Sequence, residues 1–345
     1  MTGRVVLVAT SPRIPPGLLS WPAWQALRSG PVLVGDAGHP QLAFLRDAGV
    51  DVAVLTRAAG AASGDRELAA RLHERARKDQ RVVWLSAGTA DDALVRALGE
   101  LVSRSREVAL EVVYGSYDPA GARLLDVVAV MDRLRSPGGC PWDAAQSHTS
   151  LMPYLLEESY EAYQALEDGD LTALREELGD VLLQVAFHAR LAEELPADRR
   201  WSLDDVAGDL VDKLVRRHPH VFAGASPDDL DGSWEAVKAA EKGRASVTDG
   251  VPLAQPALAL AAKLQRRARR LGVPLPAYDG PGGQLWDVVA RCAEQGVDPE
   301  AALRMTARAF RDRLATVEGQ LLAAGRDATG LTGEQWQAAW SGPAP

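Results

Sequence analysis

The sequence predicts an α+β multidomain protein in which a small N-terminal α/β domain precedes a long all-α region. Two observations predict this division. In the first third of the chain, short runs of β-branched residues alternate with helical stretches, which is typical of a largely parallel sheet with helices packed on it. Beyond Leu124, apolar residues recur at helical spacing and no convincing strand is found.

The N-terminal domain is expected to span residues 1–118. Strands are predicted at residues 4–9, 31–35, 50–56, 81–85 and 108–113. Helices are predicted between them at residues 41–48, 65–78 and 90–103. Residues 115–123 form a loop that leads into the helical region.

The helical region is divided into residues 122–250 and residues 251–345. Helices are predicted at residues 122–135, 150–166, 171–195, 203–217, 233–243, 257–271, 284–295 and 299–324. Pro219 ends one of them, because a proline inside a helix removes a hydrogen bond and clashes with the preceding turn. The helix at 257–271 is rich in arginine, which we interpret as a solvated or dimer-facing surface.

Composition excludes several classes of protein. The net charge of −9 argues against a general nucleic-acid binder. Cys140 and Cys292 lie far apart without metal-finger spacing, which is typical of a reducing cytoplasm. The first apolar run is too short for a signal peptide, and no stretch approaches 18 apolar residues. We therefore expect a cytoplasmic protein that does not bind a membrane.

Four acidic residues form two matched pairs about a turn. Glu158 and Glu161 lie three residues apart on one predicted helix, and Glu177 and Asp180 lie three apart on the next. The intervening sequence is a turn signal, so the two helices should fold back antiparallel about Gly169. In that register Glu158 faces Asp180. Glu161 then faces Glu177.

The four carboxylates should converge on one small volume. Two of them about 5 Å apart repel by roughly 3 kcal/mol at an effective dielectric near 20, so the cluster needs cations or protons. All-oxygen ligation on rigid helices suits Mg²⁺, with Mn²⁺ as a substitute, far better than zinc. Acidic residues at helical spacing usually form a solvated face, but two pairs mirrored about a turn favour a metal site.

Several motifs follow one another in a recognisable order. They read MDRLRSPGGCPWD at 131–143, QSH at 146–148, YLLEE at 154–158, EELGD at 176–180, KLVRRHPHVF at 213–222 and WEAVK at 234–238. In this order they resemble the MazG family, whose members are nucleoside triphosphate pyrophosphohydrolases of the all-α type. The resemblance covers about residues 124–270.

The resemblance implies roles for individual residues. Mg²⁺ would be held by Glu158, Glu161, Glu177 and Asp180, the set that the hairpin geometry indicates independently. Glu157 and Glu176 would orient these ligands or activate the attacking water. The implied nucleotide contacts include Tyr154, Arg175, Lys213, Arg217, Trp234 and Lys238.

The chemistry of the cationic and aromatic residues agrees with these roles. Lys213 and Arg217 are four residues apart on one helix face and can neutralise triphosphate oxygens. Trp234 offers a flat surface for a base, and Lys238, one turn later, can reach a phosphate or a base edge as a further catalytic group. Each signal alone is weak, because a tryptophan is more often core and a lysine more often solvated.

Two segments resemble known modules and depart from their patterns. Residues 115–139 resemble the junction in MazG proteins fused to a tetrapyrrole methylase domain, but residues 10–17 replace the glycine-rich S-adenosylmethionine loop. In the C-terminal segment, the helix from Ala301 to Glu318 resembles the closing helix of a second MazG repeat. Residues 282–287 there leave Asp287 as one potential ligand. We therefore expect a degenerate N-terminal domain and an inactive second repeat.

The sequence thus predicts a Mg²⁺-dependent nucleoside triphosphate pyrophosphohydrolase that releases diphosphate and clears non-standard nucleotides from the pool. The alternative is a non-catalytic nucleotide-sensing module. Two helices alone cannot bury their apolar faces or enclose a nucleotide. We therefore expect a homodimer with one active site in each chain, in which the helices at 284–324 serve as scaffold or interface.

Overall fold

The computed structural model describes residues 2–56, 61–86, 92–105, 107–224 and 246–341. They belong to two compact units, Met1–Asp212 and Lys213–Pro345. No helix in the described segments is long and apolar enough to cross a membrane.

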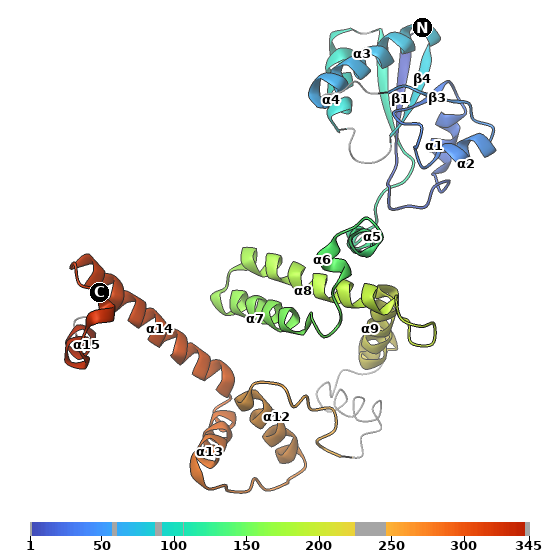
Figure 1. The fold of residues 1–345 in the computed structure, drawn as a ribbon. Coiled ribbons are helices and arrows are strands. Elements are labelled where there is room, and N and C mark those ends of the chain that lie inside the picture. The colour runs from blue at the N-terminus through green and yellow to red at the C-terminus, as the bar shows by residue number, and fades with distance from the viewer. Residues whose placement is uncertain (1, 57–60, 87–91, 106, 225–245, 342–345) are drawn as a thin grey trace. The chain divides into compact units, whose positions relative to one another are not determined.

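A five-stranded sheet lies at the start of the first unit (Figure 1). All its pairings are parallel, in the order β3-β2-β4-β1-β5. The strands are β1 Gly3–Ala9, β2 Val32–Val34, β3 Val52–Val54, β4 Arg81–Leu85 and β5 Val108–Tyr114. The predicted parallel sheet is therefore present, and the strands lie within about two residues of their expected positions.

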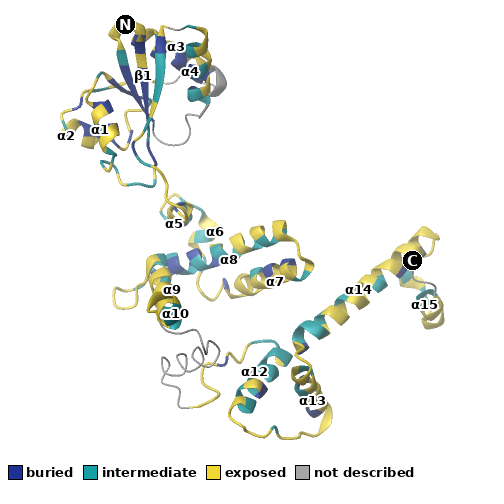
Figure 2. Ribbon diagram, turned by 180° about the vertical axis from the view of Figure 1, so that it is seen from behind, coloured by how far each residue is buried: buried dark blue, intermediate teal, exposed yellow. Residues whose placement is uncertain are grey.

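Helices cover both faces of the sheet. They are α1 Trp21–Leu27, α2 Leu42–Asp47, α3 Ala61–Asp79 and α4 Asp92–Arg104. Successive residues of β1 point to opposite faces, so Val6 packs with α1 and α2 whereas Leu7 packs with α3 and α4. This alternation explains why β1 is apolar along most of its length, and Figure 2 shows β1 mostly in dark blue.

The rest of the described chain is helical, and no strand follows β5 in the described segments. The first unit continues through α5 Arg123–Arg135, α6 Pro141–Ala144, α7 Met152–Asp168 and α8 Leu171–Ala192. Next come α9 Leu203–Arg217, whose sequence contains the boundary between the two units at residues 212 and 213, and the short α10 Pro219–Phe222. The second unit then contains α12 Ala257–Arg270, α13 Gly280–Glu294, α14 Pro299–Ala323, the 3₁₀ turn η2 Ala328–Gly330 and α15 Gly333–Trp340.

The helices differ from the sequence prediction in several places. The short helices α1, α6, α10 and α15 were not predicted. α3 begins at Ala61 and α13 at Gly280, each four residues before the predicted start. A Cβ atom at Gly283 would lie 1.7 Å from the carbonyl oxygen of Tyr278, so this turn of helix requires glycine. The helix predicted at 233–243 lies outside the described residues.

Helices α7 and α8 pack side by side as an antiparallel hairpin (Figure 1). Gly169 ends α7 in the left-handed conformation, with φ of 68°. Asp170 then caps α8, because its side chain accepts hydrogen bonds from the backbone N–H groups of Thr172 and Ala173. Ala162 and Ala186, two small residues of the hairpin, are buried. Gly179 is exposed, and a Cβ atom there would meet nothing within 4 Å.

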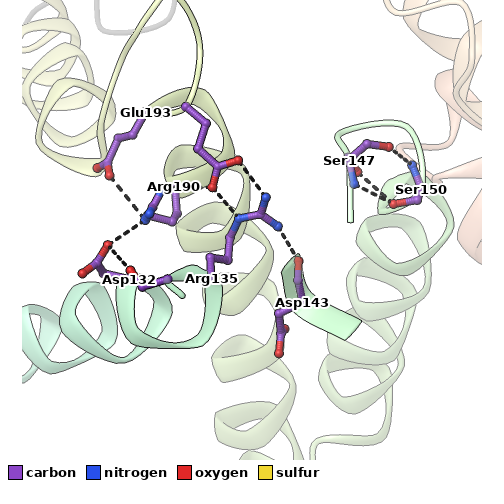
Figure 3. Close-up of polar contacts among 9 residues, drawn as sticks. Asp132, Arg135, Asp143, Ser147, Ser150, Arg190 and Glu193 are labelled. Atoms are coloured by element: carbon purple, nitrogen blue, oxygen red, sulfur yellow. Dashed lines mark hydrogen bonds and ion pairs between the residues drawn. The ribbon is translucent and has the colours of Figure 1, made fainter. Parts of the chain in front are cut away.

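Hydrogen bonds of two arginine side chains connect α5 and α6 to α8 and the residues that follow it (Figure 3). The Arg135 side chain is only 4% exposed and donates two hydrogen bonds of 2.9 Å to the carboxylate of Glu194. Its guanidinium also donates to the carbonyl oxygen of Asp143 and lies 5.5 Å from the Phe187 ring centroid. Arg190 adds a hydrogen bond of 2.9 Å to Asp132. These contacts fix the segment that leads into α7.

Candidate metal centre and nucleotide site

Three glutamates meet between α7 and α8. Glu158 and Glu161 come from α7 and Glu177 from α8, and one carboxylate oxygen of each lies within 4.8 Å of the others. This is the one group of three or more potential ligands found among the described residues. The i, i+3 spacing puts the two α7 residues on one helix face, and the turn at Gly169 brings α8 opposite them.

The electrostatics of the cluster follow from its crowding. Partial burial, followed by the charges of Asp180 and Glu161, raises the pKa of Glu158 above its usual value. The pKa of Glu177 is raised by the same causes in a similar order, first burial and then Glu161 and Asp180. Like charges therefore oppose one another here, as expected for a site that needs a counter-ion.

Asp180, the fourth predicted ligand, lies at the margin of this cluster. It is half-buried on α8, and after burial its charge contributes most to the raised pKa of Glu158. This agrees with a register in which residues 158 and 180 face each other. Its oxygens nevertheless stand outside the three-residue group in this structure.

The donor set fits a hard divalent cation. Carboxylate oxygens alone form the group, without histidine or cysteine, and such a set suits Mg²⁺ or Mn²⁺ rather than zinc. The raised pKa values of Glu158 and Glu177 agree with this, because a cation among these oxygens would offset the mutual repulsion that contributes to them.

The two glutamates with a predicted catalytic role border the cluster. Glu157 and Glu176 are exposed, each directly before a predicted ligand. The Glu157 charge contributes to the raised pKa of Glu158, and the Glu176 charge contributes to that of Glu177. Both carboxylates are therefore close enough to act on the centre electrostatically.

The predicted nucleotide-binding residues fall into three groups. Tyr154 lies one turn before Glu158 on α7, and its ring contacts that of Trp142 edge-on, with centroids 6.1 Å apart. Arg175 is exposed on α8, two residues before Glu177, and residues two apart on a helix do not share a face. Lys213 and Arg217 lie in the second unit, half-buried on the last turns of α9.

The remaining two predicted residues, Trp234 and Lys238, lie outside the described residues. The acidic stretch at 228–232, which has the wrong spacing for a calcium loop, also lies there.

A histidine pair was not predicted from the sequence. His148 and His188 stack with ring centroids 5.1 Å apart, and their Nδ1 atoms are 2.8 Å apart. Burial, followed by the charge of His148, lowers the pKa of His188. His188 lies on α8 and is half-buried against this neighbour. The two histidines are 40 residues apart in sequence. The one sequence signal near the pair is the QSH motif, which contains His148.

Comparison with known proteins identifies the helical region. Residues 146–222 match the MazG nucleotide pyrophosphohydrolase domain. An uncharacterised 26.1 kDa protein of Streptomyces cacaoi is 51% identical over 235 residues, which cover 66% of this chain and 95% of the relative.

Two further relatives carry names that state an activity. The nucleoside triphosphate pyrophosphohydrolase of Mycobacterium tuberculosis is 44% identical over 233 residues, which cover 64% of this chain and 69% of the relative. The nucleoside triphosphate pyrophosphohydrolase/pyrophosphatase MazG of Thermotoga maritima is 38% identical over 226 residues, which cover 58% of this chain and 87% of the relative. With its carboxylate hairpin inside the matched residues, the chain belongs to the MazG nucleotide pyrophosphohydrolase family.

Proposed function

We propose that this chain hydrolyses nucleoside triphosphates to the monophosphate and diphosphate. The observation that carries this function is the group of three glutamate oxygens, which lies within the residues that match the MazG domain. Relatives that are named for this activity match this chain over most of their own length, which supports the proposal. The reaction makes the protein a hydrolase of phosphoric anhydride bonds.

Glu158, Glu161, Glu177 and Asp180 would hold Mg²⁺, or Mn²⁺ in its place. The bound cation would neutralise the triphosphate oxygens and lower the pKa of a bound water. The hairpin supplies the fixed geometry, because the four side chains project from two helices joined at one capped turn. Without a cation, the same carboxylates repel the substrate.

Glu157 and Glu176 would act beside the ligands. Each is exposed and adjacent in sequence to a ligand, a position from which a carboxylate can orient that ligand or accept a proton from the attacking water. The two sit on different helices, so substituting one at a time would show which of them takes the proton.

Tyr154, Arg175, Lys213, Arg217, Trp234 and Lys238 would bind the nucleotide. The cationic members would draw a polyanion towards an acidic centre and stabilise charge that develops on the leaving diphosphate. Lys238 would also take part in catalysis. Trp234 and Tyr154 would stack on the base.

The organisation expected from the sequence also remains our proposal. Residues 1–118 would form a degenerate domain, residues 122–250 the catalytic domain and residues 251–345 an inactive second repeat. The protein would clear non-standard nucleotides in the cytoplasm, without a nucleic-acid or membrane partner.

A homodimer would complete the helical bundle. Apolar side chains on α7 and α8 are exposed in the single chain, among them Leu156 at 58% and Leu178 at 52%. Such surfaces usually mark a protein interface. Light scattering at micromolar concentration should give twice the chain mass of 36.9 kDa, and a value equal to one chain would exclude the dimer.

A phosphate-release assay tests the proposed activity. The full chain is incubated with Mg²⁺, a panel of standard and damaged triphosphates and added inorganic pyrophosphatase, so each diphosphate yields two phosphates. We expect release that depends on pyrophosphatase and stops in EDTA. Nucleotide binding without release on any substrate would instead favour the non-catalytic sensing module.

A further inference from the structure

A line of polar side chains runs along one face of α8, from the carboxylate cluster towards the end of the helix. Asp180, Gln184 and His188 follow one another at intervals of four residues, which places them on a single helix face. Asp180 belongs to the proposed metal centre, and His188 pairs with His148. Gln184 stands between these two groups and has no role in the proposed hydrolysis.

Gln184 is buried, and the oxygen of its side-chain amide lacks a hydrogen bond. The residue is 4% exposed, and its Oε1 atom has no hydrogen-bond partner among the described residues. Burying an acceptor without a donor is unfavourable, so buried amide groups are nearly always paired in folded proteins. A ligand that supplies the missing donor would explain why a polar residue is kept at this position.

The neighbours of Gln184 on α8 do not supply that donor. The carboxylate of Asp180, one turn earlier, only accepts hydrogen bonds when it is ionised. Nδ1 of His188, one turn later, lies 2.8 Å from Nδ1 of His148, and the two rings stack with centroids 5.1 Å apart. The ring of His188 is thus held by His148, and Oε1 of Gln184 accepts no hydrogen bond from it.

The register of the hairpin places Tyr154 opposite Gln184. Glu158 and Asp180 act on each other across the hairpin, and one further turn leads from them to Tyr154 on α7 and Gln184 on α8. This level lies about 6 Å along the hairpin from the carboxylates, at roughly 1.5 Å for each residue. Tyr154 is 39% exposed, and it too leaves Oε1 of Gln184 without a donor.

We propose that Gln184 binds the nucleoside part of the substrate. Its Oε1 accepts a hydrogen bond from a donor of the nucleoside, which is an N–H group of the base or a hydroxyl group of the sugar. This inference rests on the proposed function, in which the carboxylates of α7 and α8 hold the cation and, through it, the triphosphate. A nucleoside joined to that triphosphate reaches the next level of the hairpin, where Tyr154 is proposed to stack on its base.

The source of the donor decides which selectivity follows. Adenine and cytosine carry an amino group where guanine and thymine carry an acceptor oxygen. A buried site that is built to hydrogen-bond a substrate group rejects a substrate that lacks it, because the polar atom of the site is then left unpaired. A contact to the 2′ hydroxyl group would instead separate ribonucleotides from deoxyribonucleotides. A contact to the 3′ hydroxyl group would be common to both.

Calorimetry with analogues that resist hydrolysis tests this contact. The full chain with Mg²⁺ is titrated with α,β-methylene analogues of ribonucleoside and deoxyribonucleoside triphosphates, and with inorganic tripolyphosphate, which has no nucleoside. We expect Gln184→Met to weaken nucleotide binding about tenfold and to leave the affinity for tripolyphosphate unchanged. A loss confined to adenine and cytosine identifies the base as the donor, and a loss confined to ribonucleotides identifies the 2′ hydroxyl group. An equal loss on all nucleotides identifies the 3′ hydroxyl group.

Thermal unfolding without nucleotide gives a second measurement, which a merely structural role of Gln184 would move in the opposite direction. Methionine has a shape similar to that of glutamine and carries no buried amide oxygen. Gln184→Met should therefore unfold at a higher temperature than the wild type when no ligand is bound. The added analogue should then stabilise the wild type more than the variant. Gln184→Leu repeats both measurements with a different apolar side chain, so the result does not depend on how methionine packs.

Gln337→Met is the matched control, because it makes the same change at an exposed position of α15 in the second unit. We expect it to bind every ligand like the wild type. Equal nucleotide affinity of the wild type and the Gln184 variants would overturn the proposal, and so would a tenfold loss of tripolyphosphate binding. Diphosphate release is measured separately. Weaker nucleotide binding by the Gln184 variants, without release by the wild type, would contradict the proposed function and leave this contact standing.

Discussion

Two helix pairs in this protein are joined by turns of the same kind but carry different side chains. Gly169 and Asp170 join α7 to α8, and Gly296 and Asp298 join α13 to α14. In both turns a glycine with positive φ follows the first helix and an aspartate side chain caps the second. Yet acidic side chains cluster only in the first pair among the described residues. Turn chemistry therefore specifies the hairpin, whereas the side chains one or two turns away decide what the hairpin can bind.

The largest expected effect on turnover comes from comparing the loss of one acidic charge in the α7–α8 pair with the loss of one in the α13–α14 pair. Asp180→Asn or Glu161→Gln should lower turnover at least about 100-fold, because each substitution removes a formal ligand charge. The same change at Asp287 should leave turnover near the wild-type value. Steady-state kinetics with saturating Mg²⁺ measure all three. Near-normal rates in the first two variants would refute the metal site, and loss of activity in Asp287→Asn with intact assembly would refute the single-site proposal.

The second prediction concerns the arginine that fastens α5 and α6 to the catalytic hairpin. Arg135→Ala should lower the free energy of unfolding by about 2 kcal/mol, because it removes the buried guanidinium that donates to Glu194 and to the Asp143 carbonyl oxygen, while Glu194 keeps its ion pair with Arg190. The matched control is Arg75→Ala, which breaks an exposed pair with Asp79. It should cost less than about 0.5 kcal/mol. Urea unfolding distinguishes the two, and equal losses would show that burial of Arg135 adds nothing.

The third prediction uses the raised pKa values of Glu158 and Glu177. Protons compete with metal for these carboxylates, so Mg²⁺ affinity should fall by about tenfold between pH 7.5 and pH 5. In the metal-free protein the folded state holds protons more tightly than the unfolded state. Stability should therefore decrease as pH rises from about 4.3, the unfolded value, through the raised folded values.

Thermal unfolding in EDTA at the two pH values measures the stability effect. Glu158→Gln should remove much of the pH dependence and be more stable than the wild type at pH 7.5, because it relieves repulsion. A wild type that becomes more stable over this interval, with the variant unchanged, would mean that the carboxylates are not mutually repulsive.

The smallest effect is expected from the N-terminal domain. Deleting residues 1–118 should change turnover by no more than about threefold, since every proposed ligand lies beyond residue 150. Calorimetry on the full chain should also show no binding of S-adenosylmethionine, because residues 10–17 replace the expected glycine-rich loop. Micromolar binding of that cofactor would overturn the degenerate-domain proposal.

The sequence predicted those features that depend on local signals. β4 was placed at its observed bounds, since a run of β-branched and aromatic residues is bounded by polar ones. The hairpin register was predictable because Gly169 fixes where the chain reverses. α15 begins with a capping box between Thr332 and Gln335, a local sequence signal from which the start of this helix was also predictable.

Other features depended on contacts between distant residues. The seven-residue α1 begins with Trp21 and Pro22, and three of its residues are held by packing against the sheet. The sequence at the start of α13 predicts a loop, because glycine is a poor helix former. The stacking of His148 on His188 joins residues from a loop and from α8 that no periodicity relates. Tertiary packing decided each of these.

The glycine at position 283 bears on how the second repeat can change in future. In the proposed second repeat Gly283 would take the place that Glu176 has in the first hairpin, and a side chain there would overlap the carbonyl oxygen of Tyr278. Restoring an acidic residue would thus first require the backbone before α13 to move. Two independent changes would be needed before either gave an advantage. If residues 251–345 are an inactive second repeat, as proposed, a single substitution at position 283 would not restore an acidic side chain to it without a backbone change.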